Sequence, residues 1–244
     1  MTAWLKKHLF LNIVRLACIA AMAALLVFSR SGGEKRPLYF IVTFVFLFLP
    51  ELVSLVLKVD PPDALSVVYV LMLFFANILG ELIELYLSVS LWDAALHLVA
   101  GFFLALTGCS FVEILSENRS KPLLSFLFAL TFSVFIGLLW EFFEYFMDCV
   151  FRYDMQKDTL ISRVSSILLD PNGTNTSVTE VIKSVVINGN AWPGYIDIGL
   201  HDTMSDMLIA TAGGLIGAIC CHINARDPRR FRFVRSFFMK KKQK

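Results

Sequence analysis

The chain has 244 residues, of which 57 % are hydrophobic and only 17 % are charged, and its formal net charge is +2. A soluble domain with a mean hydropathy of +0.69 could not cover its surface with polar side chains, so composition excludes an ordinary soluble protein. Near-continuous apolar runs of about 20 residues are what a bilayer requires. The sequence therefore predicts an all-α fold, a polytopic transmembrane helical bundle.

Six apolar runs are long enough to cross a membrane as helices. They cover residues 9–28, 38–57, 65–88, 91–115, 123–148 and 203–224. The first run follows two lysines as a signal peptide would, but its small residues lie in the middle of the run, so we expect an uncleaved span. We expect residues 1–225 to form a single transmembrane domain.

Two charged residues lie inside the first two spans. Arg15 belongs to the first and Glu51 to the second, and an unpaired charge inside a membrane is costly, so these two side chains are candidates for a pair if they lie at the same depth. Pro50, directly before Glu51, predicts a kink in the second span because proline cannot donate a helical hydrogen bond.

The segment at 149–201 is the only sizeable part outside the spans. Its Pro, Gly and Asn residues predict turns and loop, and we expect one short amphipathic helix around 158–169 or 178–187. About fifty residues without a clear core do not fold alone. We therefore expect this segment to cap the extracytoplasmic face of the bundle.

The tail at 226–244 carries nine Lys or Arg residues. The positive-inside rule places such a tail in the cytoplasm, and six spans then place the N-terminus there too. The basic loop at 29–37 fits this orientation less well, but its positive charge is smaller than that of the tail. Arg and Phe alternate in the tail, which is typical of a segment on anionic lipid headgroups, although a plain topology signal is the simpler interpretation and nucleic-acid binding a weaker one.

Ionisable residues gather at one end of the last four spans. The third span ends with Glu81 and Glu84, the fourth begins with Asp93 and His97, the fifth ends with Glu141, Glu144 and Asp148, and the sixth begins with His201, Asp202 and Asp206. Because successive spans run in opposite directions, all of these positions share one side of the membrane. The tail orientation makes that side extracytoplasmic.

Eight carboxylates meet at this face, and the four spans contain no Lys or Arg. Like charges in a low dielectric cannot all stay ionised without a compensating charge. The sequence therefore requires something positive from outside these spans: a metal ion, protons or a cationic substrate.

The spacing of these residues places them on shared helix faces. Asp93 and His97 are four residues apart, as are Asp202 and Asp206. A His beside carboxylates suits a divalent transition metal such as zinc, manganese or iron. We predict a cation site lined by Asp93, His97, Glu141, Glu144, Asp202 and Asp206, with Glu81, Glu84 and Asp148 as further candidates.

Each of these groups also has a plainer interpretation. Asp93 and Asp202 can cap helices in interfacial water, and Asp148 can simply be solvated. Glu81 and Glu84 can form hydrogen bonds within the bundle as protonated acids. Glu141 and Glu144, together with His97, are the hardest to explain in this way.

Three local strings resemble a known family when taken in order. They are Trp92-Asp93-x-x-x-His97-x-x-x-Gly101, Trp140-Glu141-x-x-Glu144 and Asp202-Thr203-x-x-Asp206-Met207. They resemble the YjdF-like family of uncharacterised bacterial multi-pass membrane proteins, named as a domain of unknown function, over residues 40–224. The resemblance implies a bacterial cell membrane, five or six helices and these same acidic and His positions. It implies no settled activity, and Leu96 and Trp140 depart from the Gly and Tyr of the relatives.

Three uses of such a pocket stay open. An intramembrane metal-dependent hydrolase would activate water on the metal with one Glu as base. A cation- or proton-coupled transporter would use the acids to bind or relay its ion. A non-catalytic membrane factor would use the polar cluster only to hold the bundle together. The sequence lacks a Gly-x-Ser-x-Gly motif, which excludes one common hydrolase route, and it does not indicate an oligomeric state.

Overall fold

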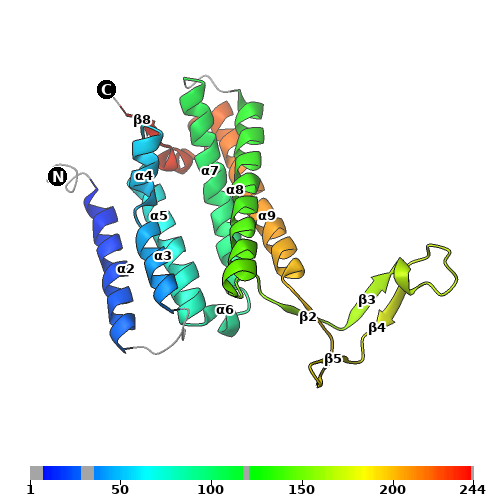
Figure 1. Ribbon diagram of the computed structural model, residues 1–244. Coiled ribbons are helices and arrows are strands. Elements are labelled where there is room, and N and C mark those ends of the chain that lie inside the picture. Colours follow the sequence, from blue (N-terminus) through cyan, green and yellow to red (C-terminus); the bar gives the residue numbers. More distant parts are fainter. Residues whose placement is uncertain (1–7, 29–35, 118–120, 243–244) are drawn as a thin grey trace. The chain divides into compact units, whose positions relative to one another are not determined.

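The computed structural model describes residues 8–28, 36–117 and 121–242, and Figure 1 shows their helices and strands. Six helices within these residues are long and apolar enough to cross a membrane. They are Leu9–Val27, Pro37–Val56, Asp63–Leu82, Trp92–Leu115, Pro122–Phe151 and Leu200–Arg226. The expected all-α polytopic bundle is thus confirmed.

The chain forms two compact units. The first comprises Met1–Leu138 together with Asp206–Lys244, and the second comprises Leu139–Ser205. Two long helices, α8 (Pro122–Phe151) and α9 (Leu200–Arg226), contribute residues to both units.

The second span is broken, as Pro50 predicted. Helix α3 (Arg36–Phe46) ends before helix α4 (Leu49–Val56) begins, and Pro50 lies in the first turn of α4. Proline lacks the N–H that would reach the carbonyl of Phe46, and the Tyr69 hydroxyl donates to that carbonyl instead, at 3.0 Å. The break therefore leaves carbonyl groups that side chains of other spans satisfy.

A side chain of the first span, α2 (Leu9–Phe28), satisfies another carbonyl at this break. Arg15 Nε donates to the carbonyl of Leu47 at 3.2 Å, and Arg15 Nη2 lies 2.7 Å from Glu51 Oε1. The predicted pairing of Arg15 with Glu51 is therefore confirmed.

The third span changes its winding along its length. Helix α5 (Asp63–Phe74) continues into a π-helical segment, Phe75–Leu82, and is followed by the short helix α6 (Leu85–Ser88). Glu84 has a positive φ of 63°, which ends the span before α6. The third span therefore ends before residue 88, where the sequence predicted its end. Its last part is wound more widely than an α-helix.

The core of the first unit lies between the fourth span, α7 (Trp92–Leu115), the start of α8 and the end of α9. Its fully buried members include Ala105, Leu106, Ala129 and Ala218. Small residues dominate this core, so the helix backbones can approach closely.

The basic tail folds back onto the first unit. A 3₁₀ helix, Arg232–Phe237, inserts Val234 into the core at 0 % exposure, and the Met239 N–H donates to Ser110 Oγ at 2.6 Å. Strand β8 (Lys240–Lys241) then pairs antiparallel with β1 (Val59–Asp60). The tail is therefore packed against the bundle on the side of the loop between spans two and three.

The second unit corrects one expectation. Short strands occupy the segment after α8 in place of the amphipathic helix predicted around 158–169 or 178–187; of helix, only a 3₁₀ turn at Ile167–Leu169 forms there. The strands are β2 (Thr159–Ile161), β3 (Arg163–Ser166), β4 (Val178–Val181), β5 (Val185–Ile187), β6 (Asn190–Trp192) and β7 (Tyr195–Asp197). They form three antiparallel pairs, β2 with β7, β3 with β4 and β5 with β6. β-branched residues are frequent in these strands, and they favour extended backbone over helix.

Candidate metal centre

Three side chains with metal-ligating atoms converge in the first unit. The His97 Nε2 atom lies 3.4 Å from Asp93 Oδ1 and 3.4 Å from Asp206 Oδ2. One ligand atom from each residue lies within 4.8 Å of those from the other two. The side chain of Asp206 is 6 % exposed, that of His97 15 % and that of Asp93 30 %. The cluster is therefore largely enclosed and reaches the surface at Asp93.

Close packing of two parallel helices brings this cluster together. A Cβ on Gly101 of α7 would lie 2.0 Å from the Ala210 carbonyl oxygen of α9, so the two backbones are in contact there. One helical turn towards the N-terminus leads from Gly101 to His97 and from Ala210 to Asp206. Spans four and six run in the same direction, so these two side chains arrive at the same level. The Gly101 contact thus sets the register of the cluster.

Further glycines extend this contact along α9. A Cβ on Gly213 would lie 2.0 Å from the Leu98 carbonyl oxygen, and one on Gly217 would lie 2.7 Å from the Phe102 carbonyl oxygen. The role of these glycines was missed in the sequence. Its available signal was the Gly213-x-x-x-Gly217 spacing, which is typical of closely packed membrane helices.

The cluster contains two carboxylates and one imidazole. Asp93 lies in the first turn of α7, where the helix dipole favours a negative charge. Each His97 contact of 3.4 Å is longer than an ordinary N–H···O hydrogen bond of about 2.9 Å. Two carboxylates thus flank one imidazole at 3.4 Å, and apart from Arg226, in the last turn of α9, spans three to six contain no Lys or Arg.

Two further candidates of the first unit lie in other environments. Glu81, in the π-helical segment, accepts a hydrogen bond from the Tyr39 hydroxyl at 3.0 Å. Glu84 is exposed and has left-handed backbone geometry at the start of α6. The structure therefore gives Glu81 a partner on α3 and places Glu84 at the surface, while their part in a cation site stays a prediction.

Glu141 and Glu144 belong to the second unit and are both buried, at 3 % and 8 % exposure. They lie three residues apart on α8 and so share a helix face. The Trp140 indole N–H donates to Glu144 Oε1 at 2.9 Å. Burial of two adjacent carboxyls in this helix supports the interpretation that they have a function, which stays a prediction.

Asp148 and Asp202, also in the second unit, hold the chain that leaves α8. Asp148 accepts hydrogen bonds from the backbone N–H groups of Met155 and Gln156, at 2.7 and 2.9 Å. Asp202 accepts one from the backbone N–H of Lys157 at 2.7 Å. Both side chains therefore have structural roles in this loop, and their contribution to a cation site stays a prediction.

A family model described as "Predicted membrane protein (DUF2238)" matches residues 11–227. The chain belongs to this family. The match confirms the expected membership of an uncharacterised family of membrane proteins. No curated protein and no solved structure matches the chain.

The part of the chain matched to the DUF2238 family contains all three motifs that first suggested a resemblance. It includes Asp93, His97 and Asp206 as well as both glutamates of α8. Most of the basic tail follows the matched residues. The cluster of Asp93, His97 and Asp206 therefore lies in the family region of this chain.

Proposed function

We propose that this protein binds a divalent transition-metal ion, such as zinc, manganese or iron, through Asp93, His97 and Asp206. The convergence of the three side chains on two parallel helices carries this proposal. One imidazole nitrogen and two carboxylate oxygens form a donor set that such ions accept. The ion would supply positive charge beside the two carboxylates, whereas Arg226, the single Lys or Arg of spans three to six, lies in the last turn of α9.

The distances within the cluster support this interpretation. A tetrahedral ion with bonds of about 2.1 Å holds its ligand atoms about 3.4 Å apart. The His97 nitrogen lies 3.4 Å from an oxygen of Asp93 and from an oxygen of Asp206. This spacing suits ligands around a common ion better than it suits direct hydrogen bonds.

A metal-dependent hydrolase is the first use we propose for this centre. Three protein ligands leave a coordination position for water, which is the arrangement of catalytic rather than structural zinc sites. The general base of such a hydrolase would be a glutamate, as the sequence predicts.

A cation- or proton-coupled transporter is the second use, and two features of the first unit favour it. The second span is interrupted between α3 and α4, and the third span ends in a π-helical segment. Discontinuous spans are common where transporters bind their ions. A purely structural role for the polar cluster is the outcome if the purified protein holds no metal.

The proposal is tested by the metal content of the purified protein. We expect about one transition-metal ion per chain in the wild type and near-complete loss in the His97→Ala variant. His201→Ala provides the matched control, because His201 is exposed and lies outside the cluster. A wild-type protein without stoichiometric metal across several growth media would contradict the proposal.

Flux measurements in liposomes separate the two uses of the centre. A transporter would move protons or the divalent cation across the vesicle membrane, and His97→Ala would abolish this flux. A hydrolase would retain its metal and show no flux. Loading the vesicles with a pH-sensitive or metal-sensitive dye gives the readout.

We also propose that the protein lies in the bacterial plasma membrane with both termini in the cytoplasm. The nine basic residues of the tail support this orientation. In a chain whose Cys149 has been replaced by Ser, an impermeant maleimide applied to intact cells should label Leu168→Cys and not Ser236→Cys. The reverse pattern would overturn the orientation.

Anionic lipids are the partner that we propose for the basic tail. Arg229, Arg230 and Arg232 are exposed, as are Phe231 and Phe233, whereas Val234 between them and the core is buried. Cationic and aromatic side chains together suit an anionic headgroup layer. The wild-type protein should be more stable in phosphatidylglycerol than in phosphatidylcholine, and replacing the three arginines by Gln should remove this difference. Equal stability of the wild type in the two lipids would contradict the proposal.

A further inference from the structure

Buried polar side chains gather in the first three spans, apart from the metal centre. They are between 0 and 7 % exposed and comprise Arg15 on α2, Tyr39 and Thr43 on α3, Ser66 on α5 and Asn77 in the π-helical segment. Polar side chains inside a membrane bundle are costly, and where they gather they commonly mark ion or proton pathways. This group therefore requires an explanation of its own.

The polar groups extend along much of the second span. Near its end, Glu51 on α4 binds Arg15 at 2.7 Å. Near its start, the Tyr39 hydroxyl donates to Glu81 at 3.0 Å, and Thr43 follows one helical turn after Tyr39. At about 1.5 Å per residue, the two contacts lie roughly 18 Å apart along the span, more than half of a hydrocarbon core of about 30 Å.

Three polar atoms of this region are buried and have no hydrogen-bond partner in the described part of the chain: Asn12 Nδ2, Thr43 Oγ1 and Glu51 Oε2. Buried polar atoms are destabilising without a partner, and internal water commonly provides one. Arg15 binds Asn12 Oδ1 through Nη1 and Glu51 Oε1 through Nη2, so the remaining amide and carboxylate atoms flank one guanidinium. Water serves both, because it accepts from an amide and donates to a carboxylate.

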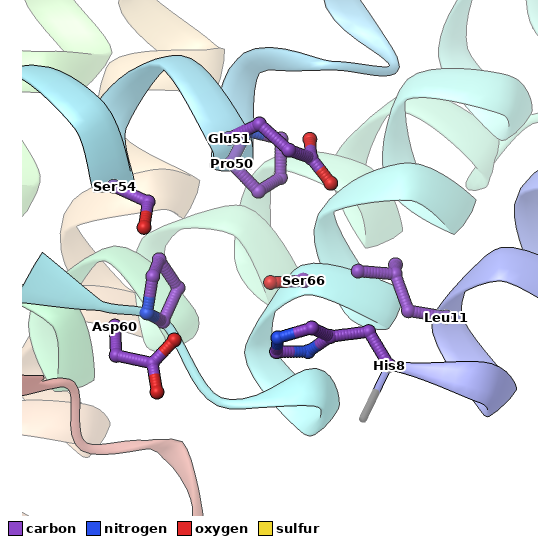
Figure 2. Close-up of a pocket in the computed structure, with 8 residues that line it drawn as sticks. His8, Leu11, Pro50, Glu51, Ser54, Asp60 and Ser66 are labelled. Carbon is purple, nitrogen blue, oxygen red and sulfur yellow. The ribbon is translucent and has the colours of Figure 1, made fainter. Parts of the chain in front are cut away.

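A pocket brings water to one end of this group. Figure 2 shows it between the start of α2, helix α4, strand β1 and the start of α5. Its empty volume is about 270 Å³, part of which is open solvent, and Glu51 and Ser66 belong to its lining. The pocket lies where spans one and three begin and span two ends, so water can approach Glu51 from that membrane face.

The charged groups around the pocket are matched within the protein. They form three pairs: Glu51 with Arg15, His8 with Asp63, and, opposite each other across β1 and β8, Asp60 with Lys240. A bound ion would upset this balance, whereas water does not.

Leu47 interrupts the polar groups of the second span. It is 0 % exposed and lies one helical turn after Thr43 and one before Glu51, so its side chain comes between theirs. A buried leucine in a polar pathway excludes water, as hydrophobic constrictions in channels do. Leu47 also lies at the break between α3 and α4, where a discontinuous span can bend.

Beyond Leu47, hydroxyl groups can pass a proton on. Thr43 Oγ1 both accepts and donates, and Asn77 lies buried on the π-helical segment, which packs against α3. The Tyr39 hydroxyl donates to Glu81 Oε2. A proton that reaches the Tyr39 oxygen therefore lets the hydroxyl proton pass to Glu81, which is partly exposed and can release it to water.

We propose that the first three spans form a gated proton route between Glu51 and Glu81. Water carries a proton to Glu51 Oε2, and Leu47 moves aside so that water connects this carboxyl to Thr43 Oγ1. Water and the Tyr39 hydroxyl then pass the proton to Glu81. At each step one O–H bond breaks and another forms on the next oxygen, so no further reactant is needed. This route rests on the transport use proposed above and does not involve the metal centre.

Arg15 does not depend on Glu51 alone during this exchange. Its Nε donates to the Leu47 carbonyl and its Nη1 to Asn12 Oδ1, both at 3.2 Å, and its guanidinium carbon lies 4.9 Å from the centre of the Phe48 ring. These neutral partners hold the cation while Glu51 is protonated.

Proton flux into liposomes tests the route. An outward potassium gradient with valinomycin drives protons into vesicles that hold a pH-sensitive dye, and the wild type should acidify them. Thr43→Val keeps the shape of the side chain and removes the hydroxyl, so we expect flux to fall at least about tenfold. Thr43→Ser keeps the hydroxyl and should retain the flux. Thr131→Val is the matched control, because the exposed Thr131 hydroxyl donates to the Leu127 carbonyl of its own helix at 2.8 Å.

A variant of the barrier tests the gate. Leu47→Ala removes most of the apolar side chain and should raise proton flux above that of the wild type. Adding Thr43→Val should cancel this increase. An increase that persists in the double variant would show a non-specific leak and overturn the gate.

Metal content separates this route from the metal centre. All of these variants should keep the metal content of the wild type, since none alters Asp93, His97 or Asp206. Equal flux in Thr43→Val and the wild type would overturn the route and leave transport standing. A wild type without proton flux would overturn both the route and proton-coupled transport, while its metal content would still decide the metal centre.

Discussion

The two ends of the first unit handle buried charge in opposite ways. At one end, Arg15 is 4 % exposed, binds Glu51 and the Leu47 carbonyl, and lies 4.9 Å from the centre of the Phe48 ring. At the other, Asp93 and Asp206 flank His97 with contacts of 3.4 Å, and Arg226, in the last turn of α9, is the single Lys or Arg of spans three to six. The first end holds a complete ion pair, and the second is the site that we propose for a metal ion.

This difference separates a complete ion pair from a candidate binding site. A buried pair that is complete within the protein is strongly destabilising to break, because the remaining charge is left without compensation. A cluster of like charges is different, because losing one member relieves repulsion. Each end should therefore respond differently to removal of one charged group.

Replacing Arg15 by Met should have the largest effect on stability. It leaves the Glu51 carboxylate without its cation and the Leu47 carbonyl without its donor, and we expect a loss of about 3 kcal/mol. The double variant Arg15→Met, Glu51→Gln should recover part of that loss. Unfolding by a denaturing detergent gives the measurement, and a double variant less stable than Arg15→Met would contradict the comparison.

Replacing Gly101 by Ala should have the second-largest effect, a loss of about 2 kcal/mol of stability, because the new methyl group meets the backbone oxygen of Ala210. Forcing α7 from α9 should also separate His97 from Asp206 and lower the metal content. Gly137→Ala on α8 is the matched control, since its Cβ would only approach Met207 Sδ at 3.8 Å. Equal metal content in both variants would break the link between helix packing and the cluster.

Replacing Asp206 by Asn should have a smaller effect, and its sign should depend on metal. Without metal, the variant should be as stable as the wild type or slightly more stable, because one of two neighbouring carboxylates is gone. With metal, the wild type should gain stability and the variant should not. A large loss of stability in metal-free Asp206→Asn would show that the cluster is structural, like the Arg15 end.

The smallest expected effect is that of protonating Asp170. Its carboxylate is exposed to water, so it provides a comparison for the buried charges at both ends of the first unit. Backbone N–H groups of Asn172, Thr176 and Thr174 and the Thr174 hydroxyl lower the pKa of Asp170 to about 2 from the usual 3.8. A lowered pKa means that the turn is stabilised above pH 3.8 and loses this stabilisation as the pH falls towards 2. Amide exchange of Thr174 across this range gives the measurement, and an increase in protection at lower pH would contradict it.

The amino-acid pattern was sufficient to predict the six spans and the pairing of Arg15 with Glu51. Apolar runs set the six helices, and the cost of a charge in a membrane made the Arg15–Glu51 contact predictable. The helical period also placed Asp93 and His97 on one face. It could not show which face of another helix they meet, because that depends on where Gly101 and Ala210 make contact.

The β5–β6 hairpin and the π-helical winding of the third span were not predicted, because their local sequence signals are weak or absent. The β5–β6 hairpin was missed although Asn188-Gly189 favours a two-residue turn, and both residues have the positive φ angles, 50° and 85°, that such a turn needs. The flanking strands are only three residues long, too short to show the alternating apolar pattern of a strand. The π-helical winding near Glu81 has no comparable sequence signal, so the partnership of Glu81 with Tyr39 could not be predicted.

The pairing of β8 with β1 has a consequence for how the protein is made. The loop that carries β1 follows the second span, whereas β8 follows the sixth, so the ribosome produces the two partners at widely separated times. Insertion of the spans must then precede closure of this side of the bundle, because Val234 and β8 reach their positions only after α9 is in place. A nascent chain halted before the tail would lack β8 and Val234, and the pairing edge of β1 and this part of the core would stay uncovered.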